Sequence, residues 1–257
     1  MPPKLSASSS IQWGNGDRVV VFLHYFGGAA ESWCWVAEQL TQQLTDCRCI
    51  ALNLPGFGGT AAPKHLSLQH YADAVSTELT QLGVNKYVLI GHSMGGKVAL
   101  QVTVSSSTPP QHVVLVAPSP PTQEPMPEAE KQRLLDNHPS RENAETTLSN
   151  ATQKALTDEQ RELAIQTHMN IEDGPWRWWL REGMNHSIAD QMAQISVPVT
   201  VLASKDDPVI DYGLIQSDVL DVIPGAKAVA IAGVGHLIPL EAPNWVIAQL
   251  CQIVQSL

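Results

Sequence analysis

The sequence predicts an α/β protein with a mostly parallel sheet that is covered by helices on both faces, and with a helical cap insertion. Short apolar runs rich in β-branched residues alternate with amphipathic stretches, which indicates that strands and helices alternate along the chain. The runs are almost continuously apolar, as in sheets buried on both faces. Of the 257 residues, 44% are hydrophobic and 16% are charged, which is typical of a compact globular chain. This length is sufficient for one large domain with an insertion.

Each element is predicted from its local pattern. Strands are expected where the apolar runs lie, at residues 19–24, 48–54, 87–90, 112–117, 197–203 and 228–232. Amphipathic stretches at 32–44 and 68–82 predict helices between the earlier strands, and a third helix is expected after Ser93. Residues 6–17 are expected to form a short strand and turn at the sheet edge, and residues 243–257 a closing helix.

A longer segment breaks this alternation after residue 117. Five prolines between residues 118 and 127 form a stiff exit from the sheet. Polar helix-like segments follow at 128–136, 141–155 and 158–169, then a tryptophan-rich stretch at 176–179, and the sheet resumes at residue 197. Such an insertion is too long for a plain loop. We therefore expect a core domain of residues 1–118 and 196–257 and a helical cap, or lid, of residues 119–195.

Charge and composition exclude several classes of partner. The net charge of −10 disfavours nucleic acid, anionic membranes and polyanionic substrates, because each of these needs a basic surface. The longest apolar runs have the length of strands, so no membrane span is expected. We expect a monomer or small homo-oligomer that binds a small molecule.

The cysteines and the first residues predict a cytoplasmic protein. Residues 1–6 lack the apolar region of a signal peptide. The four cysteines, Cys34, Cys47, Cys49 and Cys251, include no C-x-x-C pair, and Cys47 and Cys49 face the same side of one predicted strand. These observations favour reduced thiols. No spacing of histidine, cysteine and carboxylate residues matches a metal site, so we expect neither a metal nor a cofactor.

The segment Gly91-His92-Ser93-Met94-Gly95 supplies a candidate nucleophile. It lies between the predicted strand at 87–90 and a helix-like stretch, and a G-x-S-x-G at such a junction is the nucleophile elbow of α/β-hydrolases. Gly91 and Gly95 have no Cβ and allow the strand and the helix to approach closely. Ser93 would then lie at a helix N-terminus, where free backbone N–H groups face whatever its hydroxyl attacks.

A serine nucleophile needs a base to take its proton and a carboxylate to orient that base. In this fold the chain order is serine, then aspartate or glutamate, then histidine. His236 is the expected base, because it follows the predicted strand at 228–232 on a glycine-bearing loop. Asp206 and Asp207 both follow the strand at 197–203, at the sheet edge where ligands bind, and Asp211 is a weaker third candidate for the acid.

An oxyanion hole is also required, because the tetrahedral intermediate of acyl transfer carries a negative oxygen. The backbone N–H of Met94, which follows the nucleophile, is one expected donor. The second donor is expected from residues 24–28, in the loop after the strand at 19–24.

Two further motifs make the resemblance to a known family specific. His24-Tyr25-Phe26-Gly27-Gly28 with Trp33 resembles the H-G-x-x-x…W signature of α/β-hydrolases of the esterase and cofactor-free haloperoxidase type. Residues 52–58 resemble the D-x-P-G-x-G loop of the same family. The resemblance implies the α/β-hydrolase fold, with Phe26 as the second oxyanion donor and Asp207 as the acid.

The sequence departs from the family pattern at two positions. Tyr25 stands where the family usually has glycine, which is expected to alter the oxyanion loop and the mouth of the pocket. Asn53 replaces a common aspartate, and we expect a changed structural hydrogen bond there. His24 and His92 flank functional positions, and both are expected to be structural.

The cap is expected to supply part of a substrate pocket. Trp176, Trp178 and Trp179 cannot all lie on one helical face, and they are expected either to pack the cap on the core or to line the pocket. We take Tyr25, Trp176 and Trp179 as the candidate pocket residues.

The predicted substrate is a small to medium, mostly neutral carboxylic ester. No basic cluster suits CoA or a phosphate group, although Lys97, Arg177 and Arg181 could meet a single carboxylate. We therefore predict a serine esterase, that is, a carboxylic ester hydrolase that acts through a Ser-His-Asp triad and an acyl-enzyme intermediate.

Three other functions are compatible with the same motifs. The first is a perhydrolase, which the family calls a cofactor-free haloperoxidase. The second is a carbon–carbon bond hydrolase or menaquinone-pathway lyase; residues 52–59 resemble the lyase, but Lys97 stands where that group tends to have arginine. The third is a small-molecule receptor on a hydrolase scaffold, which can retain a triad. Serine at the elbow argues against haloalkane dehalogenases and epoxide hydrolases, which have aspartate there.

Overall fold

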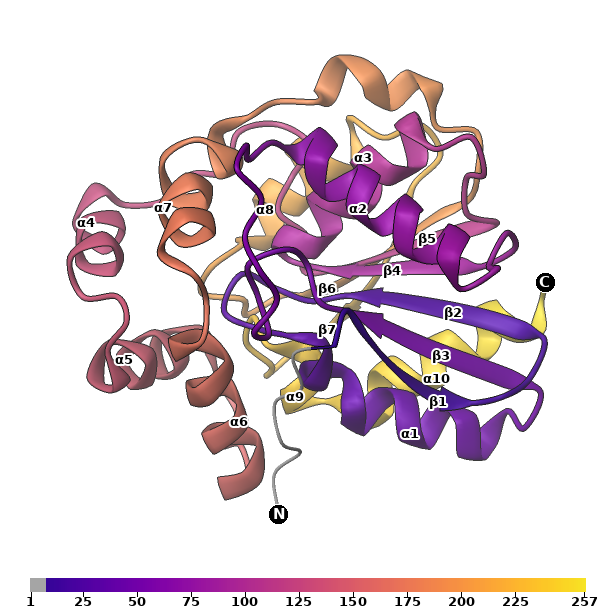
Figure 1. Cartoon of the computed structure of the whole chain (residues 1–257), viewed down its shortest axis with the longest axis horizontal. Coiled ribbons are helices and arrows are strands. Elements are labelled where there is room, and N and C mark those ends of the chain that lie inside the picture. Colours follow the sequence, from indigo (N-terminus) through magenta and orange to yellow (C-terminus); the bar gives the residue numbers. More distant parts are fainter. Residues whose placement is uncertain (1–7) are drawn as a thin grey trace.

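A computed structural model of the chain, which describes residues 8–257, is built around a seven-stranded sheet (Figure 1). The strand order is β1-β3-β2-β4-β5-β6-β7, in which β1 pairs antiparallel with β3 at one edge and all other pairs are parallel. The predicted α/β class with a mostly parallel sheet is therefore confirmed. The strands are β1 (Ser10–Gly14), β2 (Arg18–Leu23), β3 (Cys47–Leu52), β4 (Val88–His92), β5 (His112–Val116), β6 (Val199–Ser204) and β7 (Lys227–Ile231).

The edge strand predicted over residues 6–17 corresponds to β1 in its described part. Residues 1–7 lie outside the described residues, and with them the whole segment on which the expectation of no signal peptide rests. Over residues 8–257, no helix combines the length and the apolar character that crossing a membrane requires. The four cysteines are free thiols.

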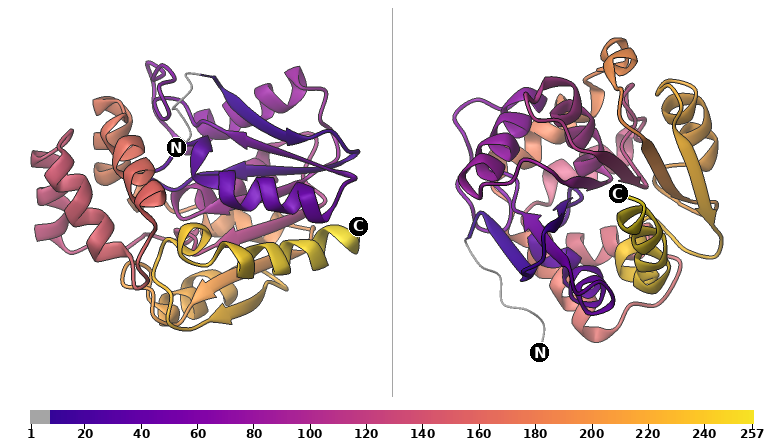
Figure 2. Two further views of the ribbon diagram at one scale, coloured as in Figure 1. Left: turned by 90° about the horizontal axis from the view of Figure 1, so that it is seen from below. Right: turned by 90° about the vertical axis from the view of Figure 1, so that its right-hand side faces the viewer.

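Helices cover both faces of the sheet (Figure 2). Side chains alternate between the two faces along each strand, so in β2 Val21 and Leu23 join one core layer while Val20 and Phe22 join the other. All four of these side chains are completely buried, and each contributes about 1.5–3 kcal/mol relative to an exposed position. The first layer packs against α2 (Leu68–Gln81), α3 (Met94–Ser105) and α8 (Tyr212–Ile215), and the second against α1 (Cys34–Gln43), α9 (Ile238–Glu241) and α10 (Pro243–Gln255).

The segment between β5 and β6 folds into helices beside the sheet rather than across either face (Figures 1 and 2). These are α4 (Glu128–Asp136), α5 (Arg141–Ala151), α6 (Asp158–Met169) and α7 (Asp173–Arg181), followed by short turns at Gly183–Asn185 and Ala189–Gln194. The helix predicted over 141–155 ends at Ala151. The chain turns to an extended conformation at Thr152, and the backbone N–H groups of Gln153 and Lys154 donate to Glu241 of α9 instead of continuing the helix.

Buried polar contacts fasten this segment to the sheet domain. The Lys97 ammonium on α3 donates to the carbonyl oxygens of Thr122 (2.8 Å), Met184 (3.0 Å) and His186 (3.1 Å). These carbonyls lie where the chain leaves the sheet and where it returns, so one side chain holds both ends of the insertion. On α6, the Thr167 hydroxyl donates to the carbonyl oxygen of Gly27 at 2.9 Å.

Candidate active site

Ser93 lies on a strained turn between β4 and α3. Its φ of 53° and ψ of −118° are unusual for a residue with a side chain, and such strain concentrates at functional sites. A Cβ on Gly91 would lie 2.2 Å from the Gly95 carbonyl oxygen, and a Cβ on Gly95 would lie 2.6 Å from the His24 carbonyl oxygen. Both positions therefore require glycine, because the strand and the helix touch at the turn.

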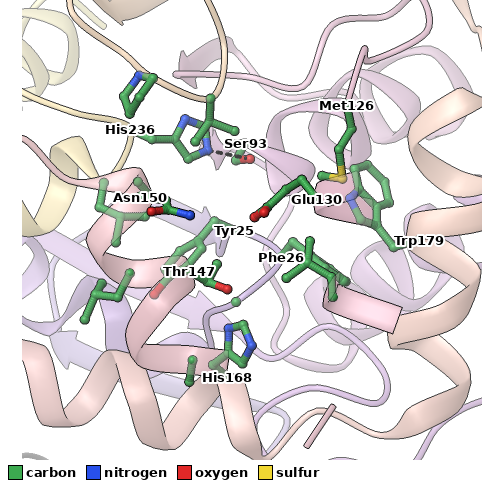
Figure 3. A pocket seen from close by; sticks show the side chains of 18 of the residues that line it. Tyr25, Phe26, Ser93, Met126, Glu130, Thr147, Asn150, His168, Trp179 and His236 are labelled. Carbon is green, nitrogen blue, oxygen red and sulfur yellow. Dashed lines mark hydrogen bonds between the residues drawn. The ribbon is translucent and has the colours of Figure 1, made fainter. Parts of the chain in front are cut away.

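A chain of hydrogen bonds joins Ser93, His236 and Asp207, which come from three different loops at the carboxyl ends of the strands. His236 Nε2 lies 2.9 Å from Ser93 Oγ, and His236 Nδ1 lies 2.9 Å from Asp207 Oδ2 (Figure 3 shows the first of these bonds). With a neutral imidazole, the serine hydroxyl donates to Nε2 and the Nδ1–H group donates to the carboxylate. All three side chains are buried.

The structure separates the three aspartates that the sequence left open as partners of the base. Asp207 faces His236, and its second oxygen accepts from the backbone N–H groups of Val209 (2.8 Å) and Ile210 (2.9 Å). Asp206 is exposed and accepts from the Gly233 N–H at 2.6 Å. Asp211 caps α8.

The electrostatics of the pair prepare His236 to accept a proton. Burial alone would lower the pKa of His236, but the Asp207 carboxylate, with smaller contributions from Glu124 and Glu241, raises it above its ordinary value of 6.5. Burial would also raise the pKa of Asp207, but the facing imidazole and two backbone N–H donors hold it below its ordinary value. Asp207 is therefore ionised near neutral pH, and its charge favours the imidazolium form of His236.

His24 and His92 have structural partners. His24 Nε2 accepts from the Leu54 N–H at 3.1 Å, and His92 Nε2 lies 2.9 Å from the carbonyl oxygen of His236. Burial lowers the pKa of His24 to about 4 and that of His92 to about 3, so both rings are neutral. Asn53, the second departure from the family pattern, accepts from the Ala30 N–H at 2.8 Å and closes the base of the oxyanion loop.

The loop that carries His236 is docked onto the end of α5. The His236 N–H donates to the Ala151 carbonyl oxygen at 2.8 Å, and a Cβ on Gly235 would lie 2.6 Å from the same oxygen. Glu241 accepts from the N–H groups on both sides of the histidine, from Gly235 at 2.8 Å and from Leu237 at 3.1 Å. It also accepts from Gln153 and Lys154 at 2.8 Å each, so a single buried carboxylate ties the histidine loop to the insertion.

The two predicted oxyanion donors are the backbone N–H groups of Met94 and Phe26. Met94 is the first residue of α3, so its N–H has no acceptor within the helix. Phe26 lies inside a turn closed by the Gly28 N–H, which donates to the Tyr25 carbonyl oxygen at 3.0 Å. The ring of Tyr25 lies over Gly27 and Gly28, where a Cβ would come within 3.0 Å and 2.6 Å of it, so this glycine pair accommodates the tyrosine.

Ser93 and His236 open into a cavity of about 350 Å³ between the sheet domain and the insertion (Figure 3). The candidate pocket residues Tyr25, Trp176 and Trp179 all line it. Trp176 is fully buried, with its ring stacked on Phe26 at 4.4 Å between centroids, and its indole N–H donates to the Leu134 carbonyl oxygen at 3.0 Å.

Trp178, the remaining residue of the tryptophan cluster, points away from the cavity. Its ring packs on Tyr71 of α2 at 5.4 Å between centroids. The cluster therefore does both things expected of it, since Trp176 and Trp179 line the cavity and Trp178 packs on the core.

The charged residues of the cavity differ from those that the sequence suggested. The candidate carboxylate anchors do not line it: the protons of Lys97 go to backbone carbonyls, Arg177 pairs with Asp173 at 2.8 Å, and Arg181 is exposed. Glu124 and Glu130 line it instead. Sequence reasoning missed these two glutamates and Glu241, since each is an isolated acidic residue whose environment depends on the docking of the insertion.

The fold and the site define a hydrolase of the α/β type, and the family comparison agrees. The chain belongs to the alpha/beta hydrolase family, whose pattern matches residues 20–249. The family inferred from the sequence motifs, with esterase-like and haloperoxidase-like relatives, is therefore confirmed.

Individual relatives cover nearly the whole chain at low identity. The chain is 25% identical over 246 residues to a putative 2-succinyl-6-hydroxy-2,4-cyclohexadiene-1-carboxylate synthase of Bacillus subtilis (strain 168), covering 90% of this chain and 88% of the relative. It is 24% identical over 280 residues to the bifunctional esterase/perhydrolase DCH of Acinetobacter calcoaceticus, covering 95% and 94%.

Solved structures share the fold. An esterase from Exiguobacterium antarcticum superposes with a TM-score of 0.87 at 16% identity, covering 96% of this chain and 94% of that one. A bromoperoxidase from Bacillus anthracis superposes with a TM-score of 0.82 at 16% identity, with the same coverage. At this identity the likeness establishes the fold alone.

Proposed function

We propose that the protein is a carboxylic ester hydrolase in which Ser93 is the nucleophile, His236 the general base and Asp207 the acid that orients it. The observation that carries this proposal is the continuous chain of hydrogen bonds from the Ser93 hydroxyl to the buried Asp207 carboxylate, with 2.9 Å at each step. The esterase among the similar structures and the esterase/perhydrolase relative support the same reaction class.

The geometry suits an acyl-transfer sequence. Ser93 Oγ attacks the ester carbonyl carbon while its proton passes to His236 Nε2, and the N–H groups of Phe26 and Met94 are proposed to hold the resulting oxyanion. The alcohol leaves with the proton from His236, and an acyl group remains on Ser93. His236 then takes a proton from water, which attacks the acyl-enzyme and releases the acid. Asp207 stays ionised throughout and stabilises each imidazolium.

Cavity size and charge support the substrate class. A volume of about 350 Å³ is small for a ligand pocket and suits short to medium acyl chains. The acidic lining disfavours substrates with a negative charge. We take residues 119–195 as the cap that closes this pocket, a small-molecule ester as the partner, and a monomer or small homo-oligomer in the cytoplasm as the working form; the four free thiols support the location.

A series of 4-nitrophenyl esters from acetate to octanoate tests this proposal. Each methylene that finds an apolar wall adds about 0.8 kcal/mol at most, so kcat/KM should rise up to about fourfold per carbon until the cavity is full and then fall. The Ser93→Ala variant should turn over none of the series above the rate of free imidazole. A steady rise to long chains, with a jump in rate at the solubility limit, would indicate a lipase-like groove instead.

Two other reactions could use the same residues. One observation supports the first of them, and another argues against the second. Perhydrolysis, in which hydrogen peroxide replaces water in the second step, is supported by the esterase/perhydrolase relative and would appear as peracid formed from acetate and peroxide. The synthase relative is named for a carboxylate product. A cavity lined by Glu124 and Glu130 opposes such an anion, so carbon–carbon chemistry on an anionic substrate is disfavoured.

A further inference from the structure

The cavity contains a buried carboxylate that the proposed reaction does not use. Glu124 lies on the segment that leaves β5, is 6% exposed, and is fixed by its N–H, which donates to the Met184 carbonyl oxygen at 2.9 Å. Its side chain lines the same cavity as Ser93 and His236. Its Oε2 atom is buried and has no hydrogen-bond partner among the described residues. A carboxylate in such a place is costly to keep, because buried charges need a partner.

The nearest protein cation does not hydrogen-bond this carboxylate. Burial raises the pKa of Glu124, and the nearby Ser119 hydroxyl and the charge of Lys97 offset this only in part. The three donors of Lys97 go to Thr122, Met184 and His186. Lys97 therefore compensates part of the charge without hydrogen-bonding the carboxylate, and a cation in the cavity that Glu124 lines would compensate the rest.

A second carboxylate faces the same space. Glu130 of α4 also lines the cavity, and its side chain is visible near Ser93 in Figure 3. Arg133, one turn along the helix, holds it through a bidentate ion pair and also donates to Asn143 and Thr147. The guanidinium lies behind the carboxylate and is not part of the wall.

The remaining walls carry no positive charge that would repel a cation. Phe26, Trp176 and Trp179 supply apolar surface, because Trp176 stacks on both Phe26 (4.4 Å) and His138 (4.1 Å between centroids) and Lys97 Nζ already lies 5.9 Å from the Trp179 ring centroid. His168 is neutral, because burial lowers its pKa to about 3. Among the residues found to line the cavity there is no lysine or arginine.

We infer that the cavity recognises carboxylic esters that carry an ammonium group, which Glu124 and Glu130 hold while the ester carbonyl lies at Ser93. This inference rests on the proposed ester hydrolysis and names the preferred class of substrate within it. Neutral esters of the same shape are hydrolysed, but less efficiently, and anionic ones least of all.

Matched esters test the inference. The acyl side is probed with 4-nitrophenyl 4-(trimethylammonio)butanoate against its neutral isostere, 4-nitrophenyl 5,5-dimethylhexanoate, and against the anionic mono-4-nitrophenyl glutarate. The alcohol side is probed with choline butyrate against 3,3-dimethylbutyl butyrate. For at least one side, kcat/KM for the cation should exceed that for the neutral isostere by about tenfold or more, after correction for uncatalysed hydrolysis. The anionic ester should be about tenfold worse than the neutral one.

Three variants test whether the preference for the cationic ester arises in the cavity. In Glu124→Gln the ratio of cation to neutral isostere should fall towards one, and Glu130→Gln should lower it less because Arg133 already shares that charge. Glu128→Gln removes the same charge from an exposed position on α4 outside the cavity and should keep the wild-type ratio. The ratio is measured within each variant, so a loss of folded protein does not mimic the effect.

Results that would overturn this inference can be distinguished from results that would contradict the proposed ester hydrolysis. Wild-type ratios near one on both sides, with neutral esters still hydrolysed through Ser93, would overturn this inference and leave the esterase proposal standing. An equal loss on the cationic and neutral esters in Glu124→Gln would show that Glu124 serves only as a counter-ion for Lys97, which also overturns it. No turnover of any ester would contradict the proposed function itself.

Discussion

The cavity has two walls, and their side chains are held in different ways. On the sheet side, Ser93, His236 and Asp207 are fixed by backbone strain and by hydrogen bonds of 2.8–2.9 Å, with little room to move. On the side of the insertion, rings pack on rings, as Phe26 does on Trp176, and the acidic groups are Glu124 and Glu130. In the proposed reaction the first wall positions the reacting atoms, while the second sets the shape and charge of the cavity.

Buried polar contacts join the two walls. Glu241 binds the His236 loop to the end of α5, Lys97 binds both ends of the insertion to α3, and Thr167 binds α6 to the oxyanion loop. Through these contacts the insertion is attached to the loop that carries His236, to helix α3 and to the loop at residues 24–28. This arrangement argues against a lid that swings open as one body. Substitutions at the contacts between the two walls are therefore informative tests of the comparison.

The largest effect is expected at the nucleophile. Ser93→Ala should lower kcat for aryl esters by about 10⁴-fold or more, because the acyl-enzyme can no longer form. The midpoint of thermal unfolding should stay close to that of the wild type, since the change removes one oxygen from a strained turn. Steady-state assays and thermal scans check both. Retention of more than a few per cent of kcat would show that the reaction does not pass through Ser93.

The next largest effect separates the two neighbouring aspartates. Asp207→Asn should lower kcat by about 10³-fold or more, because it removes the anion that stabilises the imidazolium and fixes its tautomer. It should also move the acid limb of kcat/KM to lower pH, since Asp207 raises the pKa of His236. Asp206→Asn is the matched control and should change kcat only a few-fold. Equal losses in the two variants would contradict the assignment.

Substitution of Glu241 tests the contact between the His236 loop and the insertion. Glu241→Gln should lower kcat by about ten- to a hundredfold, because the amide presents donors to backbone N–H groups and the His236 loop shifts. KM should change little. The acid limb of kcat/KM should move to lower pH, because the Glu241 charge contributes to the raised pKa of His236. Glu38→Gln, at an exposed position of α1, is the control for charge. A fall in stability with no shift of the pH profile would indicate a purely structural role.

The smallest effect on catalysis is expected at Lys97. Lys97→Met should lower the free energy of unfolding by about 2–4 kcal/mol, because it leaves three buried carbonyl oxygens and Glu124 without their cation. Urea titration measures this loss. For neutral esters kcat should change less than tenfold, since Lys97 does not touch the cavity. A large fall in kcat without loss of stability would place Lys97 in the reaction rather than in the scaffold.

The sheet wall could be predicted from the sequence because its determinants are local. Apolar runs mark the strands, and Gly91 and Gly95 bracket Ser93 so closely that the turn can be inferred from five residues. The choice between Asp206 and Asp207 could only be narrowed by spacing. It is decided by which carboxylate the turn after β6 directs at His236, and that depends on three-dimensional placement.

The wall that the insertion forms could not be predicted to the same depth. Its tryptophans were recognisable as candidates, but the environments of Glu124, Glu130 and Glu241 arise only when the insertion docks on the sheet edge. The end of α5 illustrates the cause: local pattern favours a helix to residue 155, while the tertiary contact with Glu241 captures two backbone N–H groups and ends the helix at Ala151. Isolated acidic residues carry no pattern from which such contacts could be read.

Covalent labelling tests the central claim most directly. The wild-type protein is treated with a fluorophosphonate, which reacts with activated serine hydroxyls, and the adduct is located by peptide mass spectrometry. We expect one adduct per chain, on Ser93, with a labelling rate that falls as pH drops below the raised pKa of His236 and that is greatly reduced in Asp207→Asn. Labelling of another serine, or labelling of Ser93 at an unchanged rate in Asp207→Asn, would contradict the account of the hydrogen-bonded site.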